Sequence, residues 1–133
     1  MSLVLIVLIE LVFMAKHIEL GIKGEIIAVN YLKEKGFHIL ERNYRFKRGE
    51  VDIIAQKDNC LRVIEVKTRQ SHYMAGPEIT VTRKKQKAIL DVANAYININ
   101  NFDGETQFDI VSIILNEKMV EIELLEDAFY PLL

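Results

Sequence analysis

The chain has 133 residues, of which half are apolar and about a quarter are charged, so it is long enough for one globular domain with a buried core. Its single cysteine, Cys60, excludes an internal disulfide, and we expect a reducing, cytoplasmic location. The formal net charge of −2 argues by itself against a nucleic-acid partner, but the charges are unevenly distributed.

The charge changes sign along the chain. From Lys33 to Lys87 there are 14 Lys and Arg against 7 Asp and Glu, a local charge of +7. From Ala88 onward only Lys118 accompanies nine acids, a local charge of −8. This asymmetry favours one basic and one acidic surface, and a basic surface suits a phosphate-containing partner. The alternative is two solvated faces that bind nothing.

The first residues form an unusual apolar stretch, since Leu3 to Met14 is interrupted only by Glu10. The stretch is too short to span a bilayer as a helix and lacks the features of a signal peptide, so we expect no membrane partner. We therefore separate residues 1–15 from a single domain over residues 16–133. Met14 resembles a natural start, which indicates a mis-assigned start or added residues. The alternative is an apolar arm that packs on the domain or favours self-association.

Within the domain, apolar residues at helical spacing predict a helix from about Lys16 to Lys35, with Gly36 as its C-terminal stop. Alternating apolar residues and turn signals then predict three consecutive strands. These strands cover residues 37–46, 50–56 and 61–68, with turns at 47–49 and 57–60. Residues 70–78, which include Gly76-Pro77, are predicted to form a loop.

A second amphipathic helix is predicted after Thr82, which is a suitable N-cap. Its apolar stripe consists of Ile89, Val92, Ala93, Tyr96 and Ile97. A loop over 98–107 and two strands, over 108–115 and 119–125, complete the chain. The resulting order α-β-β-β-α-β-β contains no internal repeat and no linker, and it predicts a single α/β domain.

Two of the predicted strands carry charges where apolar residues are usual: Glu50 and Asp52 on one, Glu65 and Lys67 on the next. Buried charges cost free energy unless something binds to them. If a loop of two or four residues joins the strands, Asp52 lies opposite Glu65 and Glu50 lies opposite Lys67. The hairpin would then gather all four charges on one face.

Two carboxylates this close repel each other unless a cation lies between them. Oxygen-only ligands favour Mg²⁺ or Mn²⁺, so Asp52 and Glu65 are candidate ligands for one or two ions that would activate water against a phosphodiester. Lys67 would orient that water or balance charge in the transition state. The alternative is a solvent-facing ladder of ion pairs, such as Glu50 with Lys67, which would contribute little to stability.

Basic residues flank this hairpin and crowd the first turn of the second helix. Cations at a helix N-terminus oppose the helix dipole, whereas helix amides together with basic side chains bind phosphate well. The candidate nucleic-acid contacts are Arg45, Arg48, Arg69, Arg83, Lys84 and Lys85. An ordinary solvated surface is the alternative for these residues.

The residues also resemble a known pattern. Asp52 followed by Glu65-Val66-Lys67 is similar to the D…(D/E)-x-K signature of the PD-(D/E)xK nuclease superfamily. A longer set resembles the YraN-like family, whose members are similar to archaeal Holliday-junction resolvases. That set is Gly21-x-x-Gly24-Glu25-x-x-Ala28-x-x-Tyr31-Leu32-x-x-x-Gly36, Asn43-Tyr44-Arg45, Gly49-Glu50-Val51-Asp52, Glu65-Val66-Lys67-Thr68-Arg69, Lys85-Gln86 and Phe108-Asp109.

This resemblance implies a restriction-endonuclease-like fold, in which helices flank a mixed sheet. It implies Asp52 and Glu65 as catalytic metal ligands, Lys67 as the catalytic lysine and Glu25 as an extra metal-binding acid. Without the resemblance, Glu25 reads as an ordinary exposed helix acid. The metal implied is again Mg²⁺ or Mn²⁺.

Further residues take their expected roles from the same resemblance. Glu50 and Gln86 are expected to support the site, and Gln107 stands where an arginine often precedes Phe-Asp. The implied activity is metal-dependent hydrolysis of DNA, including branched or damaged DNA, with a homodimer as one expected assembly. Three alternatives stay open: action on RNA, a non-catalytic nucleic-acid-binding module of the same fold, and an interaction protein that uses the apolar arm.

Overall fold

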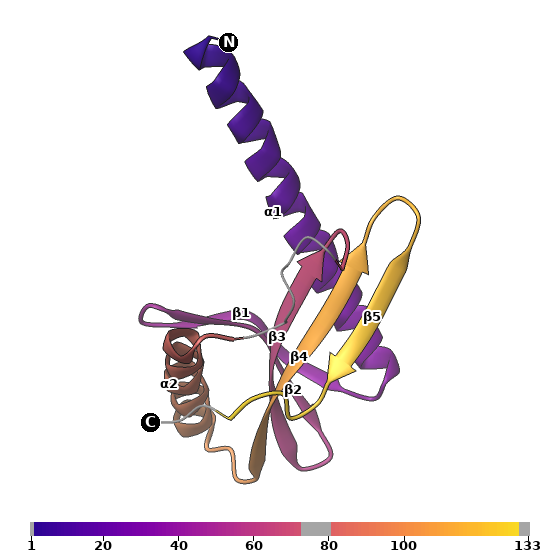
Figure 1. Cartoon of the computed structure of the whole chain (residues 1–133). Coiled ribbons are helices and arrows are strands. Elements are labelled where there is room, and N and C mark those ends of the chain that lie inside the picture. Colours follow the sequence, from indigo (N-terminus) through magenta and orange to yellow (C-terminus); the bar gives the residue numbers. More distant parts are fainter. Residues whose placement is uncertain (1, 73–80, 131–133) are drawn as a thin grey trace.

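A computed structural model describes residues 2–72 and 81–130, and in this part of the chain two helices flank a five-stranded sheet (Figure 1). The elements are α1 (Leu3–Glu34), β1 (His38–Phe46), β2 (Gly49–Lys57), β3 (Cys60–Arg69), α2 (Arg83–Asn100), β4 (Glu105–Leu115) and β5 (Val120–Leu125). The predicted order and the mixed sheet flanked by helices are confirmed. Most of the predicted loop at 70–78 lies outside the described residues.

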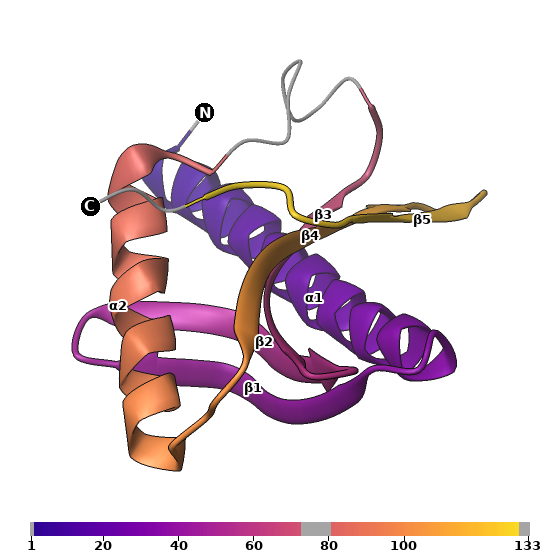
Figure 2. The ribbon, with the colours of Figure 1, turned by 90° about the horizontal axis from the view of Figure 1, so that it is seen from below.

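The strands lie in the order β1-β2-β3-β4-β5, and every neighbouring pair is antiparallel except β3 and β4. Parallel strands need a crossover connection, and α2 lies in the connection between these two. Figure 2 shows α1 and α2 on opposite faces of the sheet. Each face has its own core: Leu32 on α1 belongs to one cluster and Ile89 on α2 to the other.

Local signals explain the helix ends near the domain. Gly36 has a φ of +90° after the end of α1, as expected of a glycine stop. Thr82 caps α2, because its side chain accepts a hydrogen bond from the Lys85 amide at 3.2 Å. The second helix runs to Asn100, beyond the predicted start of the loop, and ends where Asn101 adopts the left-handed conformation.

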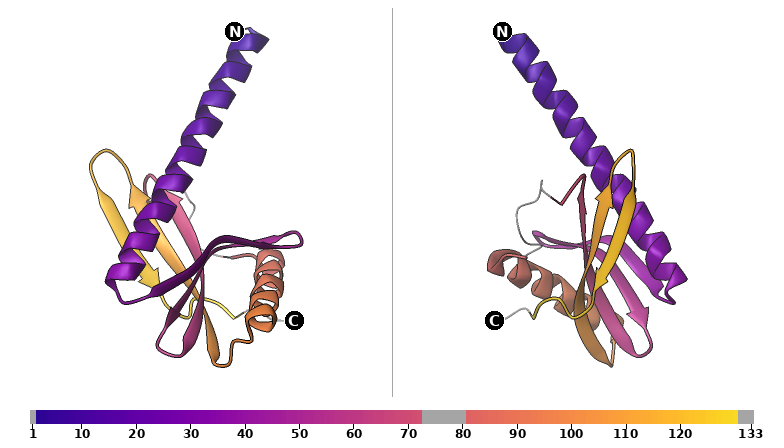
Figure 3. Two further views of the ribbon diagram at one scale, coloured as in Figure 1. Left: turned by 180° about the vertical axis from the view of Figure 1, so that it is seen from behind. Right: turned by 45° about the vertical axis from the view of Figure 1, so that its right-hand side comes forward.

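The N-terminal half of α1 differs from the prediction. The helix begins at Leu3 rather than near Lys16, with Ser2 as its N-cap. Because no proline interrupts the residues before Lys16, the apolar stretch from Leu3 to Met14 extends the helix toward the N-terminus. Figure 3 shows this half projecting away from the sheet, and its side chains from Leu3 to Met14 are exposed. No helix among the described residues is long and apolar enough to cross a membrane.

The hairpin of β2 and β3 has the predicted register over its outer part. Pairing runs from Lys57 with Cys60, next to the turn, to Ile53 with Ile64. Over the described strands the ladder stops there, so the predicted cross-strand pairings of Asp52 with Glu65 and of Glu50 with Lys67 are both wrong. Glu50 pairs instead with Arg45 on β1.

Candidate functional site

The site begins where β2 leaves β3. Oδ2 of Asp52 accepts a hydrogen bond of 2.8 Å from the backbone amide of Val66. This contact occupies a β3 amide at the inner end of the ladder, and it holds the Asp52 carboxylate between the diverging strands. Beyond it, the hairpin of β1 and β2 reaches α2 (Figure 2), where Tyr44 packs edge-on against Tyr96. We call the point of divergence at Asp52 the fork.

Two glycines let the helices approach the fork from opposite sides. A Cβ at Gly24 on α1 would lie 1.8 Å from Oγ1 of Thr68, so only glycine fits against β3 there. A Cβ at Gly49 would lie 2.6 Å from Cγ2 of Val92 on α2. These close contacts give a physical reason for the glycines in the Gly24-Glu25 and Gly49-Glu50 segments. They bring α1 and α2 close to Asp52.

A pocket of about 250 Å³ opens on the α2 side of the fork. Its lining residues are Arg48, Gly49, Glu50, Asp52, Glu65, Lys85, Ala88 and Ile89. Glu65 is only 1% exposed, and its Oε2 atom lies 3.0 Å from Nζ of Lys85. Its Oε1 atom is buried and has no hydrogen-bond partner among the described residues. One oxygen of this carboxylate is therefore available to a ligand.

A larger cleft of about 650 Å³ lies on the α1 side. Glu25, Asn43, Arg45, Glu50, Asp52 and Lys67 are among its lining residues. Asn43 donates a hydrogen bond of 3.3 Å to Glu25, and Arg45 forms an ion pair of 3.5 Å with Glu50. Since Asp52 lines both cavities, it stands between Glu25 on one side and Glu65 on the other.

The crowding of charges shifts the proton affinities of these groups. Burial, followed by the repulsion of the Asp52 carboxylate, raises the pKa of Glu65 to about 7. Burial also raises the pKa of Asp52, against the hydrogen bond from Val66. Burial and the neighbouring Lys85 ammonium lower the pKa of Lys67. Burial and mutual repulsion therefore disfavour two negative charges at this pair of carboxylates.

A divalent cation fits this pair of carboxylates. Asp52 and Glu65 supply oxygen ligands, and the unpartnered Oε1 of Glu65 has no competing contact among the described residues. Mg²⁺ commonly takes one or two carboxylates and completes its shell with water and substrate phosphate. No three His, Cys, Asp or Glu side chains of residues 2–72 and 81–130 are grouped closely enough to hold an ion together. Glu25 as a third ligand stays a prediction.

The structure distributes the predicted phosphate contacts over different places. Arg48 borders the α2-side pocket, while Arg83 and Lys84 are exposed on the first turn of α2. Arg69 lies away from the fork, in a depression beside β5 with Glu121 and Glu123. The structure therefore places two of these residues, Arg83 and Lys84, on the same helix turn as Lys85.

Lys85 and Gln86 lie differently from the predicted arrangement. The side-chain amide of Gln86 donates to the carbonyl of Val81 at 2.8 Å, which fixes the start of α2. Lys85 reaches into the site instead. The sequence does contain a signal for this, because Lys85 precedes Ile89 by four positions and Val92 by seven, so it lies on the apolar face of the helix.

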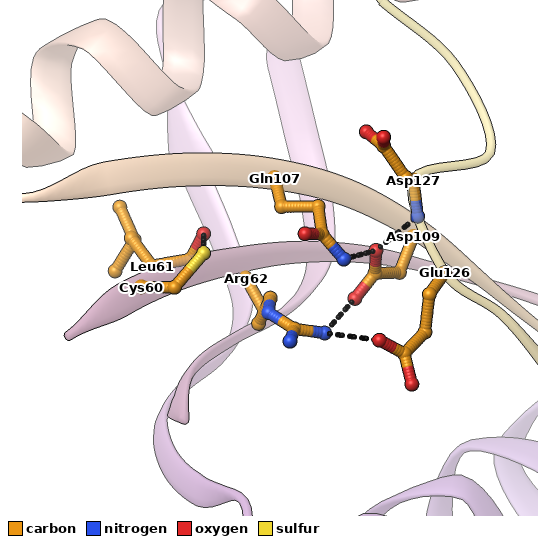
Figure 4. A network of polar contacts seen from close by, with 7 residues as sticks. All are labelled: Cys60, Leu61, Arg62, Gln107, Asp109, Glu126 and Asp127. Atoms are coloured by element: carbon orange, nitrogen blue, oxygen red, sulfur yellow. Dashed lines mark hydrogen bonds and ion pairs between the residues drawn. The ribbon is translucent and has the colours of Figure 1, made fainter. Parts of the chain in front are cut away.

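Sequence reasoning also missed a buried polar network away from the fork (Figure 4). The Asp109 carboxylate is fully buried and accepts three hydrogen bonds, from Arg62 at 2.9 Å, Gln107 at 2.9 Å and the Asp127 amide at 2.8 Å. Arg62 also contacts Glu126 at 3.4 Å. The network ties β3, β4 and the segment after β5 together, so Asp109 has a structural role.

Comparison with known proteins identifies relatives over most of the chain. The model of "Uncharacterised protein family UPF0102" matches residues 24–113. A UPF0102 protein of Flavobacterium psychrophilum is 43% identical over 117 residues, which are 88% of this chain and 98% of the relative. One from Flavobacterium johnsoniae is 46% identical over 121 residues, with the same coverage. One from Bacteroides thetaiotaomicron is 42% identical over 118 residues, 89% of this chain and 98% of the relative.

Proposed function

The chain belongs to the uncharacterised protein family UPF0102, and we propose that it is a metal-dependent endonuclease that hydrolyses phosphodiester bonds in DNA. The proposal depends above all on Glu65, a buried carboxylate with one unpartnered oxygen beside a second carboxylate, Asp52. The buried Asp109 carboxylate accepts three hydrogen bonds, whereas Glu65 has one oxygen without a partner among the described residues, and an incompletely paired buried charge is costly.

The chain's own residues have separable roles in this reaction. Asp52, fixed by the Val66 amide, and Glu65 present oxygen atoms toward the fork. A divalent cation held by these two carboxylates would supply Lewis-acid chemistry, which would polarise a phosphodiester and make water a better nucleophile. Lys67 is close enough to both carboxylates for their negative charges to favour its ammonium form. Its ammonium would stabilise the negative charge that develops on the phosphoryl oxygens.

The surroundings of the fork support a nucleic-acid substrate. Arg48, at the tip of the β1–β2 hairpin, and Arg83 and Lys84, at the start of α2, are exposed. A helix N-terminus with basic side chains binds phosphate through its amides and their charges together. A DNA backbone lying between the hairpin tip and α2 would pass over the α2-side pocket.

One observation favours a second candidate function, a non-catalytic nucleic-acid-binding module. The ion pair of Lys85 with Glu65 compensates one buried carboxylate without any metal. Such a module would bind DNA equally well with and without a divalent cation. Its binding would depend strongly on salt, because backbone contacts release counterions.

A cleavage assay separates the two candidates. Labelled linear, nicked, flapped and four-way DNA, with matching RNA, is incubated with the protein in Mg²⁺ or Mn²⁺. The Asp52→Asn variant is the control, because its amide oxygen can still accept the Val66 hydrogen bond while the negative charge is lost. We expect cleavage of at least one DNA substrate, at least about a hundredfold slower in the variant, with DNA binding retained.

Failure of the assay has a defined meaning. No cleavage of any DNA, together with equal binding in EDTA and Mg²⁺, would end the endonuclease proposal in favour of the binding module. Cleavage of RNA alone would contradict the assignment of DNA as the substrate.

A further inference from the structure

Lys85 holds an unusual position for a structural ion-pair partner. A buried ion pair stabilises a fold only when its remaining polar atoms are also satisfied, but Oε1 of Glu65 has no partner among the described residues. The ammonium also stands in the first turn of α2, where a cation opposes the helix dipole. Both facts indicate that the contact between Lys85 and Glu65 serves something other than stability.

The backbone of Lys85 is held independently of its side chain. Its amide donates to Oγ1 of Thr82, which holds the residue at the capped start of α2 whatever its side chain does. The Lys85 side chain is 45% exposed, whereas the side chain of its partner Glu65 is 2% exposed. Nζ can therefore leave Glu65 toward solvent without breaking the cap or the core.

The balance of charges indicates what would move the Lys85 ammonium away from Glu65. The Glu65 carboxylate contacts the Lys85 ammonium at 3.0 Å. Asp52 lines the α2-side pocket with Lys85 and the α1-side cleft with Lys67, so the four formal charges of this cluster cancel. A divalent cation on the same carboxylates would add two positive charges next to both ammonium groups. The cation and the Lys85 ammonium therefore compete for Glu65. A phosphate at the neighbouring helix N-terminus would receive the displaced ammonium.

We propose that Lys85 is an exchangeable counter-ion, which neutralises Glu65 until a divalent cation binds and then transfers its Nζ to a phosphate of the nucleic-acid backbone. This inference rests on the proposed function, because it assigns a role to Lys85 in the same site. It makes metal binding and phosphate binding mutually supportive, with Lys85 as the link between them.

The metal part is tested by calorimetric titration of Mn²⁺ into the full chain. Lys85→Met removes the competing charge and keeps the length of the side chain, so we expect Mn²⁺ affinity to rise about tenfold or more. Lys84→Met is the matched control, since this lysine is exposed on the same turn, and its affinity should stay within about twofold of the wild type. Lys85→Arg keeps the charge and should bind Mn²⁺ no more tightly than the wild type.

The phosphate part is tested by DNA binding in Ca²⁺, which also takes oxygen ligands, and in EDTA. In EDTA, Lys85 is engaged by Glu65, so Lys85→Met should bind DNA as the wild type does. In Ca²⁺, the same variant should bind about tenfold more weakly. Lys84→Met should weaken binding by a similar factor in both conditions.

Nuclear magnetic resonance observes Lys85 in the wild-type protein, so its result does not depend on the stability of Lys85→Met. The Cε–Hε signal of Lys85, assigned by its loss in Lys85→Arg, should move toward the position of an exposed lysine when Mg²⁺ is added. A signal that Mg²⁺ leaves unchanged would overturn the proposal.

Unchanged or weaker Mn²⁺ affinity in Lys85→Met, or a gain shared by Lys84→Met, would also overturn it. The absence of Mn²⁺ binding by both the wild type and Lys85→Met would overturn the proposal as well. Cleavage by the wild type with unchanged Mn²⁺ affinity in Lys85→Met would overturn only the exchange. Tighter Mn²⁺ binding in that variant, without cleavage by the wild type, would support the exchange and contradict the endonuclease.

Discussion

The carboxylate of Asp52 accepts a hydrogen bond of 2.8 Å from the backbone amide of Val66. The β2–β3 ladder ends next to this contact, at the pair of Ile53 with Ile64. The contact places a charged side chain between two diverging strands, where a backbone carbonyl would otherwise accept the amide. Glu65 lines the pocket on the α2 side, and Glu25, a residue of α1, lines the cleft on the α1 side. Asp52 lies between them and lines both. The chemistry proposed for the site follows from this fork.

Gly24 should be essential for the approach of α1. Gly24→Ala would put a Cβ 1.8 Å from Oγ1 and 2.8 Å from Cβ of Thr68, and rotation of the Thr68 side chain relieves only the first contact. We expect a loss of about 1–3 kcal/mol in the free energy of unfolding, measured by chemical denaturation.

Gly21 provides the matched control for that substitution. It lies three residues earlier in the same helix, and a Cβ there meets nothing within 4 Å. Gly21→Ala should therefore stabilise the protein by about 0.5–1 kcal/mol, because alanine is the better helix former. Equal effects of the two substitutions would contradict the close packing of α1 on β3.

The stability of the metal-free protein should fall as Glu65 loses its proton. The folded protein holds that proton with a pKa of about 7, above the ordinary value of 4.5. Protonation therefore favours folding, and stability should decline as the pH rises from about 4.5 to about 7. At about 1.4 kcal/mol per pKa unit, the decline from this group is at most about 3.5 kcal/mol.

The variant Glu65→Gln removes this titration and should lose less stability over the same range. Denaturation in EDTA at pH 5 and pH 8 measures the difference. Parallel pH dependence in the wild type and the variant would show that Glu65 is not held protonated by its surroundings.

Asp109 should matter for stability rather than for metal binding. Asp109→Ala would leave the Arg62 guanidinium, the Gln107 amide and the Asp127 amide without their shared acceptor. We expect a loss of about 3–5 kcal/mol with unchanged Mn²⁺ affinity in whatever fraction is folded. Asp91→Ala, on the exposed side of α2, should stay within about 0.5 kcal/mol of the wild type.

Replacing both members of the buried pair gives a further check. Arg62→Met combined with Asp109→Leu removes the two charges together, so its cost should be smaller than that of Asp109→Ala. A larger cost for the double variant would contradict the idea that an unpaired Arg62 causes most of the loss.

Arg83 and Lys84 should contribute to DNA affinity through the backbone alone. Arg83→Ala and Lys84→Ala should each reduce the slope of log affinity against log salt concentration by about 0.9, without changing sequence preference. Lys33→Ala, in the last turn of α1, should leave the slope unchanged. Equal slopes for all three variants and the wild type would exclude α2 from the interface.

Local sequence signals accounted for most of the fold. Gly36 and Thr82 act as the predicted helix stop and cap, and the outer register of the β2–β3 hairpin follows from its short turn. The start of α1 was not predictable from the same rules, because no breaker precedes Lys16. Its first residues form an exposed helix.

The site was predicted less completely, because its geometry depends on the fork. The register predicted from the turn continues the ladder to Glu50 and Lys67. In the structure the strands separate after the pair of Ile53 with Ile64, where the Val66 amide donates to Asp52 instead. The pairing of Lys85 with Glu65 joins elements distant in sequence. The alternation of strand residues carries no information about such a contact.

Anomalous diffraction from a crystal of the wild-type protein soaked in Mn²⁺ tests the proposed metal site most directly. The predicted result is an anomalous peak within bonding distance of the carboxylates of Asp52 and Glu65, with Nζ of Lys85 turned away from Glu65. No peak at this pair, with Lys85 still bound to Glu65 at a saturating Mn²⁺ concentration, would contradict the metal-dependent function.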